Sequence, residues 1–272
     1  GGLVGAVYAA GYSTEKIEKT IKELDQHRSF SRNSDDHPSL LGLSWITKKL
    51  SDLLGDMTFD ELKIPFAATA VSLKTGEEII LHEGKVLDAV CATIAIPGVF
   101  PSQEIGGRVL VDGGVLDPVP VRLARWMRPD LPIVAVQLHK FPDGYVPEEL
   151  SFSLPIPIPG PSSIIDKLKQ LRPVQALKIF TRSIEVSGQH LTELNMKLYK
   201  PEVVISPPVG HIGVLQKMNI DELIKIGWDA TNQTVEKIKS EANWMKKIQR
   251  KVKHRINPEP YPEYWAKVNS KT

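Results

Sequence analysis

The stretch that most constrains the fold is a short apolar run that ends in an acid and two glycines. Val109, Leu110 and Val111 are typical of a buried strand in a parallel sheet, and Asp112 stands where that strand ends. The chain can turn sharply at Gly113 and Gly114 and leave space beside the carboxylate, because neither residue has a Cβ. Since ligands of open α/β sheets bind outside the carboxyl ends of strands, Asp112 is a candidate functional residue.

A purely structural role for Asp112 fits the same pattern. Asp is a favoured N-cap residue, and a helix is predicted over Val119–Met127, shortly after the turn. A second buried strand is predicted over Ile133–Leu138, which would complete a right-handed βαβ unit with the strand before Asp112. The local pattern alone leaves the capping role and the functional role open.

The beginning of the chain carries a second informative stretch, Gly1–Gly11. Its glycines and alanines predict a helix that packs closely against a sheet or another helix. Together with Asp112–Gly114, Thr93–Pro101 and Pro65–Val71, this stretch resembles the patatin-like phospholipases, most closely their bacterial members. In that family a Gly-x-Ser-x-Gly elbow leads into such a helix. Residues 1–11 match the helix with Gly1 as the last glycine of the elbow, and residues 112–114 match the family's Asp-Gly-Gly motif.

The resemblance implies an α/β fold and a lipid acyl hydrolase. The expected fold has a mostly parallel central sheet with helices on both faces in three layers, with the first strand and the elbow missing. The expected domain spans residues 1–235. The mechanism implied is a Ser-Asp dyad acting through an acyl-enzyme, with Asp112 as the base and a lipid ester as the substrate. Gly1, Gly113 and Gly114 are the matching turn positions at the active site.

The resemblance also places the serine two residues before Gly1 and the glycine-rich oxyanion loop further upstream. The chain is therefore expected to be a truncated catalytic domain that is inactive alone. Pro97, Val99 and Phe100 are candidates for lining the acyl pocket, although the same residues would serve equally as ordinary core and turn residues.

Composition narrows the other function classes. The 272 residues, 42% hydrophobic, can bury one sizeable core, and the net charge of +2 gives no overall attraction to nucleic acid. Cys91 is the single cysteine and lies in an apolar run, which favours a buried structural thiol. No metal site or cofactor is predicted.

No apolar run reaches the 18 to 20 or so residues of a membrane-spanning helix. A cytoplasmic or peripheral-membrane location is expected, and a signal peptide is not assessable from this sequence.

Residues 236–272 form a separate predicted region. Between Glu236 and Ile256 there are eight Lys or Arg residues against two Glu, with apolar residues at near-helical spacing. This basic amphipathic helix could contact an anionic membrane surface, helped by Trp244 and later aromatic residues. The alternative, slightly favoured, is a packed terminal helix whose basic face is solvated.

Two other functions fit the sequence. One is a non-catalytic relative that binds lipid or a partner. The other is an α/β hydrolase with a Ser-His-Asp triad that uses His211 or His139.

Overall fold

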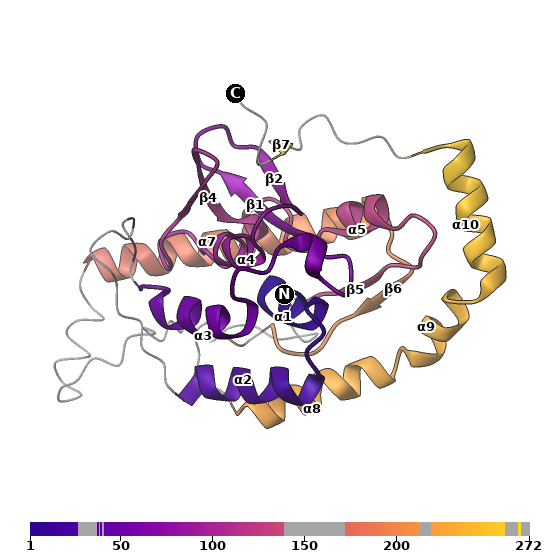
Figure 1. The fold of residues 1–272 in the computed structure, drawn as a ribbon, viewed down its shortest axis with the longest axis horizontal. Helices are drawn as coiled ribbons and strands as arrows, with labels where there is room; N and C mark the ends of the chain where they lie inside the picture. The colour runs from indigo at the N-terminus through magenta and orange to yellow at the C-terminus, as the bar shows by residue number, and fades with distance from the viewer. Residues whose placement is uncertain are drawn as a thin grey trace. The chain divides into compact units, whose positions relative to one another are not determined.

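The computed structural model describes residues 1–26, 37, 39, 41–138, 172–210, 212, 219–258 and 266–267 (Figure 1). The chain divides into two compact units. The first contains residues 1–116 and 263–272, and the second contains residues 117–262. The predicted domain boundary at residue 235 does not coincide with this division, because residues 236–258 belong to the same compact unit as residues 117–235.

Four α-helices of the first unit surround an apolar core. They are α1 (Gly2–Ala9), α2 (Thr14–Gln26), α3 (Ser44–Leu54) and α4 (Val86–Thr93). A short 3₁₀ helix, η1, spans Phe59–Glu61. Ala6 and Val7 of α1 pack with Leu50 of α3 and Val90 of α4 in one buried cluster. Helix α4 ends at Thr93, before Pro97 and Gly98.

The sheet of the first unit has the strand order β3-β4-β1-β2-β7. The strands are β1 (Ala68–Ser72), β2 (Glu78–Leu81), β3 (Gln103–Ile105), β4 (Arg108–Asp112) and β7 (Ala266–Lys267). All of β1 and β2 is buried, and α4 packs against β1, β3 and β4. β1 and β2 form an antiparallel hairpin in which Ala68 faces Leu81.

The pairing direction of β4 differs from the prediction. β4 pairs antiparallel with both β1 and β3, so it is a buried strand, but not one of a parallel sheet. Gly106 and Gly107 both have positive φ and join β3 to β4 in a two-residue turn, the geometry of a tight antiparallel hairpin. Apolar content indicates burial and not direction, which is why the run Val109–Val111 misled the prediction.

The second unit contains a small parallel sheet. The elements of this unit are α5 (Val121–Met127), β5 (Val134–Val136), α7 (Arg172–Tyr199), β6 (Val203–Ile205), α8 (Ile220–Asn232), α9 (Val235–Glu241) and α10 (Trp244–Ile256). β5 pairs in parallel with β6, and Ala135 faces Val204. The predicted βαβ unit is therefore wrong in its partner, because β5 pairs with β6 and not with β4. The α/β class is confirmed, with parallel pairing between β5 and β6 and between β2 and β7 among the described strands.

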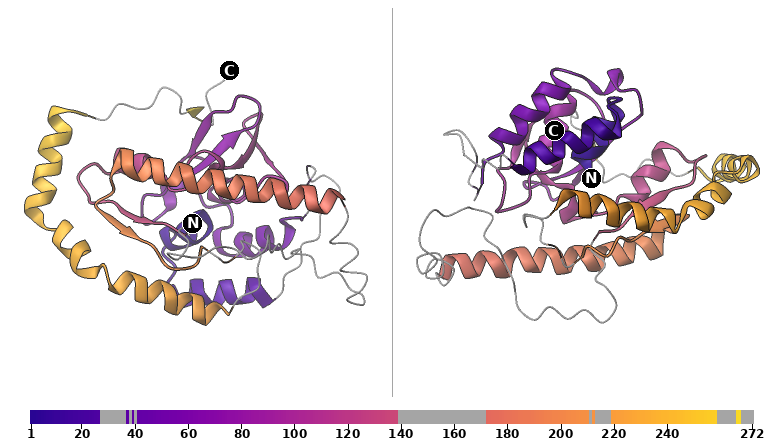
Figure 2. Two further views of the ribbon diagram at one scale, coloured as in Figure 1. Left: turned by 180° about the vertical axis from the view of Figure 1, so that it is seen from behind. Right: turned by 90° about the horizontal axis from the view of Figure 1, so that it is seen from below.

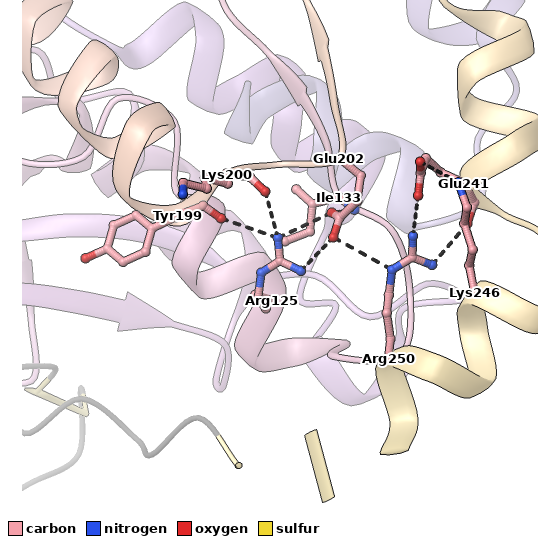
Figure 3. A network of polar contacts seen from close by, with 8 residues as sticks. All are labelled: Arg125, Ile133, Tyr199, Lys200, Glu202, Glu241, Lys246 and Arg250. Carbon is pink, nitrogen blue, oxygen red and sulfur yellow. Dashed lines mark hydrogen bonds and ion pairs between the residues drawn. The ribbon is translucent and has the colours of Figure 1, made fainter. Parts of the chain in front are cut away.

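A polar network fixes the elements around this small sheet (Figure 3). The Arg125 guanidinium of α5 donates to both carboxylate oxygens of Glu202, at 2.9 and 3.3 Å, just before β6. It also donates to the carbonyl oxygens of Tyr199 and Lys200, where α7 ends. Glu202 in turn accepts a 2.8 Å hydrogen bond from the backbone N–H of Ile133 beside β5. One ion pair thus joins α5, the end of α7 and both strands.

The last helix is attached to this network through its basic side. Arg250 of α10 contacts Glu202 at 3.7 Å and Glu241 at 2.7 Å, and Lys246 contacts Glu241 at 2.7 Å. The favoured prediction of a packed apolar face and a solvated basic face is wrong for α10, because acidic partners on the same unit hold part of its basic face. Figure 2 shows α8, α9 and α10 as a curved run of helices, with α10 last.

We expect Glu202→Gln to weaken the second unit by about 1–3 kcal/mol at pH 7, since the charged hydrogen bonds to Arg125 are lost. Burial opposes ionisation of Glu202, but Arg125 and the Ile133 N–H outweigh it, and the pKa of Glu202 is lowered. A lowered carboxyl pKa stabilises the fold above the unfolded value of about 4.3, and this stabilisation is lost as the pH falls through the folded value.

Urea unfolding of wild type and variant at pH 7 and pH 3.5 measures this effect, and the gap between them should narrow at the lower pH. Glu236→Gln is the matched control, because Glu236 pairs with Lys239 on an exposed surface and should contribute nothing measurable. An equal gap at both pH values would contradict the assignment.

Candidate functional site

Asp112 is the last residue of β4 and lies opposite Ala70 of β1. Its Oδ1 accepts a 2.8 Å hydrogen bond from the backbone N–H of Gly114 and so caps a short 3₁₀ helix, η2 (Gly113–Val115). Its backbone N–H donates to the carbonyl oxygen of Ala95 at 3.0 Å. The capping role predicted for Asp112 is therefore present, but it serves η2 and not the helix near Pro120. These contacts fix the direction of the carboxylate.

Gly113 is held against the neighbouring strand β1. A Cβ built on Gly113 would lie 2.6 Å from both the backbone carbonyl carbon and the Cβ of Thr69, a separation that real Cβ atoms do not reach. Only glycine therefore lets the chain turn this close to β1 after Asp112. The prediction that the turn needs glycine is confirmed at this position, for a reason of space.

The front of α1 lies near Asp112. The negative charge of Asp112 acts on the Gly1 ammonium and favours its charged form, while surrounding protein desolvates it more strongly and lowers its pKa overall. The structure thus brings together Gly1 and Asp112, two residues 111 positions apart that the sequence pattern assigned to one site.

Small residues bring α1 this close to its neighbours. A Cβ on Gly2 would overlap the side chain of Thr93 at the end of α4, and one on Gly5 would lie 3.1 Å from the Phe66 ring. The predicted close packing of this helix is confirmed by these two contacts. The N-terminal end of α1, which carries the positive end of the helix dipole, therefore lies at Gly1.

The three candidates for an acyl pocket lie in the segment between α4 and β3. Val99 and Phe100 are buried, Pro97 is half-buried, and the carbonyl oxygen of Val99 accepts a hydrogen bond from the Leu41 N–H. The same segment contains Ala95, whose carbonyl receives the Asp112 N–H. The segment therefore runs beside Asp112, and a pocket-lining role for these three residues stays a prediction.

Sequence reasoning missed a half-buried carboxyl group, Asp117, at the start of the second unit. Asp117 accepts a 2.9 Å hydrogen bond from the Asn195 side chain of α7. Burial raises the pKa of Asp117, and the hydrogen bonds from Asn195 and Val119 oppose this. Its position in the sequence, five residues after Asp112, is the signal that could have identified it.

The other features considered are metal sites, membrane spans and the two candidate histidines. Among the described residues, no group of three or more His, Cys, Asp or Glu side chains could hold a metal ion. No helix in the described part of the chain has the length and apolar character needed to cross a membrane. His211 and His139 lie outside the described residues.

Comparisons with known proteins agree with the motifs. Residues 1–125 match the family model of the patatin-like phospholipases. Uncharacterized NTE family proteins Rv1063c of Mycobacterium tuberculosis and Mb1092c of Mycobacterium bovis are 37% identical over 142 residues, which is 51% of this chain and 39% of theirs. Another such protein of M. tuberculosis, Rv2565, is 28% identical over 187 residues, 67% of this chain and 30% of its own. The chain thus spans about two fifths or less of these relatives.

The Cys91 thiol should react slowly with a thiol reagent at pH 7. It is buried, burial raises its pKa, and the Thr47 side chain lies 3.6 Å from its sulfur. The thiolate is the reactive form, so both access and ionisation are limited. Measured with a chromogenic disulfide, one thiol should appear only after denaturant is added, and rapid labelling of the folded chain would contradict this account.

Replacement of Gly113 by Ala should destabilise the first unit by about 1–3 kcal/mol, since the new Cβ would overlap Thr69. Gly227→Ala is the matched control, because a Cβ there meets nothing within 4 Å and α8 should gain up to about 1 kcal/mol. Urea unfolding curves compare the two. Equal stability of the Gly113→Ala chain and the wild type would show that β1 does not restrict this turn.

Proposed function

We propose that the protein is a lipid acyl hydrolase that cleaves carboxylic esters with a Ser-Asp dyad, since residues 1–125 match the family model of the patatin-like phospholipases. The observation that carries the proposal is the packing of the front of α1 close to Asp112. A Cβ on Gly2 would overlap the Thr93 side chain, and the Asp112 N–H donates to the carbonyl oxygen of Ala95, two residues after Thr93. In the family, the nucleophile stands two residues before the position of Gly1, so a serine there would begin beside this carboxylate.

Asp112 would act as the general base. A serine hydroxyl is a weak nucleophile and needs a base within hydrogen-bond reach. As the serine oxygen attacks the ester carbonyl, its proton would pass to Asp112, and the alcohol portion of the lipid would leave with a proton. The leaving alcohol would take this proton from Asp112, which returns to the carboxylate. Water would then attack the acyl-enzyme and give a proton to Asp112, and Asp112 would pass it to the serine oxygen as the fatty acid is released.

Two features of the described residues support this role. Gly114 holds Oδ1 of Asp112, so the carboxylate is oriented before a substrate arrives. The positive end of the α1 dipole would favour the oxyanion, together with backbone N–H groups of a glycine-rich loop that the family has further upstream. The substrate would be a phospholipid, lysophospholipid or related lipid ester, and no cofactor is required by this scheme.

The 272 residues alone are expected to be inactive under this proposal. Without the serine before Gly1 they should neither hydrolyse an ester nor react with a fluorophosphonate. The alternatives are a non-catalytic lipid- or partner-binding relative and a triad enzyme that uses His211.

In the full-length protein, Asp112→Asn should lower ester hydrolysis by about 10²–10⁴-fold, the usual contribution of a positioned base. A chromogenic short-chain ester measures the rate, and a fluorescent fluorophosphonate measures reactivity of the serine. Asp56→Asn is the matched control, since Asp56 pairs with Lys85 on an exposed surface and should leave both unchanged.

The variants His211→Ala and His139→Ala separate the alternatives. Their activity should survive if the dyad acts without histidine, whereas a loss as large as that of Asp112→Asn would favour the triad. Absence of hydrolysis and of fluorophosphonate labelling in the wild type would instead favour the non-catalytic relative.

A further inference from the structure

Helix α10 presents its apolar residues to solvent. Its sequence, Trp-Met-Lys-Lys-Ile-Gln-Arg-Lys-Val-Lys-His-Arg-Ile, contains no acid. All of its large apolar residues are exposed, with exposed fractions between 50 and 79%. They are Trp244, Met245, Ile248, Val252 and Ile256. A packed terminal helix would bury these residues.

The residues of α10 that approach the protein are basic. Lys246, Lys247, Arg250 and His254 are its half-buried positions. Arg250 contacts Glu241 and Glu202, and Lys246 contacts Glu241 (Figure 3). Lys247 lies 3.8 Å from Asp130. The helix is therefore attached by ion pairs, and its orientation is the reverse of an ordinary surface helix.

Helical geometry separates the two sets cleanly. At 3.6 residues per turn, the half-buried positions fall on one side of α10 and the exposed apolar positions fall on the opposite side. The apolar positions 245, 248, 252 and 256 follow steps of three and four, so they form one continuous stripe. Exposed apolar surface that is contiguous marks an interaction site more often than scattered single residues do.

The charges beside the stripe indicate what would cover it. By the same geometry, Lys251 and Arg255 flank the stripe on one side and Lys253 flanks it on the other, and all three are exposed. An apolar stripe between cations fits a bilayer surface with anionic headgroups, and Trp244 suits the interface between headgroups and acyl chains. The 13 residues of α10 are about 20 Å long, so the helix would lie along the surface and not cross it.

A second copy of α10 fits this stripe less well. Two such helices packed along their stripes would bring Lys251, Lys253 and Arg255 of one copy close to the same cations of the other, without an acid on either helix. We propose that α10 is a membrane-docking helix whose exposed stripe of Met245, Ile248, Val252 and Ile256 lies on an anionic lipid bilayer. The basic face that holds α10 to the protein leaves this stripe directed outward.

The test is sedimentation of the full-length protein with vesicles of non-hydrolysable diether lipids. Vesicles of phosphatidylcholine alone are compared with vesicles that also contain phosphatidylglycerol. These lipids cannot be cleaved, so binding is measured independently of the proposed hydrolase activity. We expect binding to the anionic vesicles only, weakened strongly by added salt because the cations contribute through their charge.

Two variants test the parts of the surface. Ile248→Glu with Val252→Glu should reduce binding at least tenfold, since charged groups enter the apolar stripe. Gln233→Glu with Ser240→Glu makes the same change in net charge at exposed positions of the same unit outside the stripe, and should reduce binding much less. Lys251→Gln with Lys253→Gln and Arg255→Gln should also weaken binding, by about fivefold per residue at low salt.

Folding and insertion are measured in parallel. All substituted positions are exposed, so circular dichroism melting should match the wild type. Trp244 fluorescence, taken as the difference from Trp244→Phe, should shift to the blue with anionic vesicles. Equal binding of the stripe variant and its charge-matched control would overturn the proposal. So would a wild type that does not bind anionic vesicles, or one that self-associates through the stripe instead of binding them.

Discussion

The close approach of Gly113 to β1 is the constraint on which the site depends. The chain leaves β4 at Asp112 and must pass Thr69 at a separation that excludes any side chain. The turn then places the Gly114 N–H where it holds the Asp112 carboxylate at 2.8 Å. Glycines of α1 have the same function at Thr93 and Phe66, so the helix front also comes close to the carboxylate. Because these glycines have no side chains, two stretches that are far apart in the sequence can pack close together.

The close packing at the glycines was more predictable from sequence than the pairing of the strands around them. Glycines at Asp112–Gly114 and Gly1–Gly11 indicate close approach, and a family resemblance connects the two stretches. The apolar run before Asp112 indicates only burial, so it suggested a parallel sheet, whereas β4 is antiparallel to both neighbours. The turn at Gly106 and Gly107 was the local signal for that direction. The pairing of β5 with β6 joins residues about 70 positions apart, and no local pattern indicates it.

The C-terminal helix shows a different limit of sequence patterns. Amphipathic spacing predicts that α10 has two unlike faces, but it does not say which face meets the protein. Here the choice depends on Glu202 and Glu241, acids outside the helix that attract Arg250. Glu202 is also the acid that holds Arg125, so one carboxylate serves both the small parallel sheet and the attachment of α10. Charges supplied by other elements therefore reverse the usual orientation of the helix.

The position of Gly1 has a practical consequence for work with this chain. Its amino group lies within range of the Asp112 charge, so anything joined to that nitrogen begins beside the carboxylate. The first residues of an affinity tag fused at this end would become part of the site's surroundings. A cleavage scar of one or two small residues would leave those surroundings closer to their own chemistry.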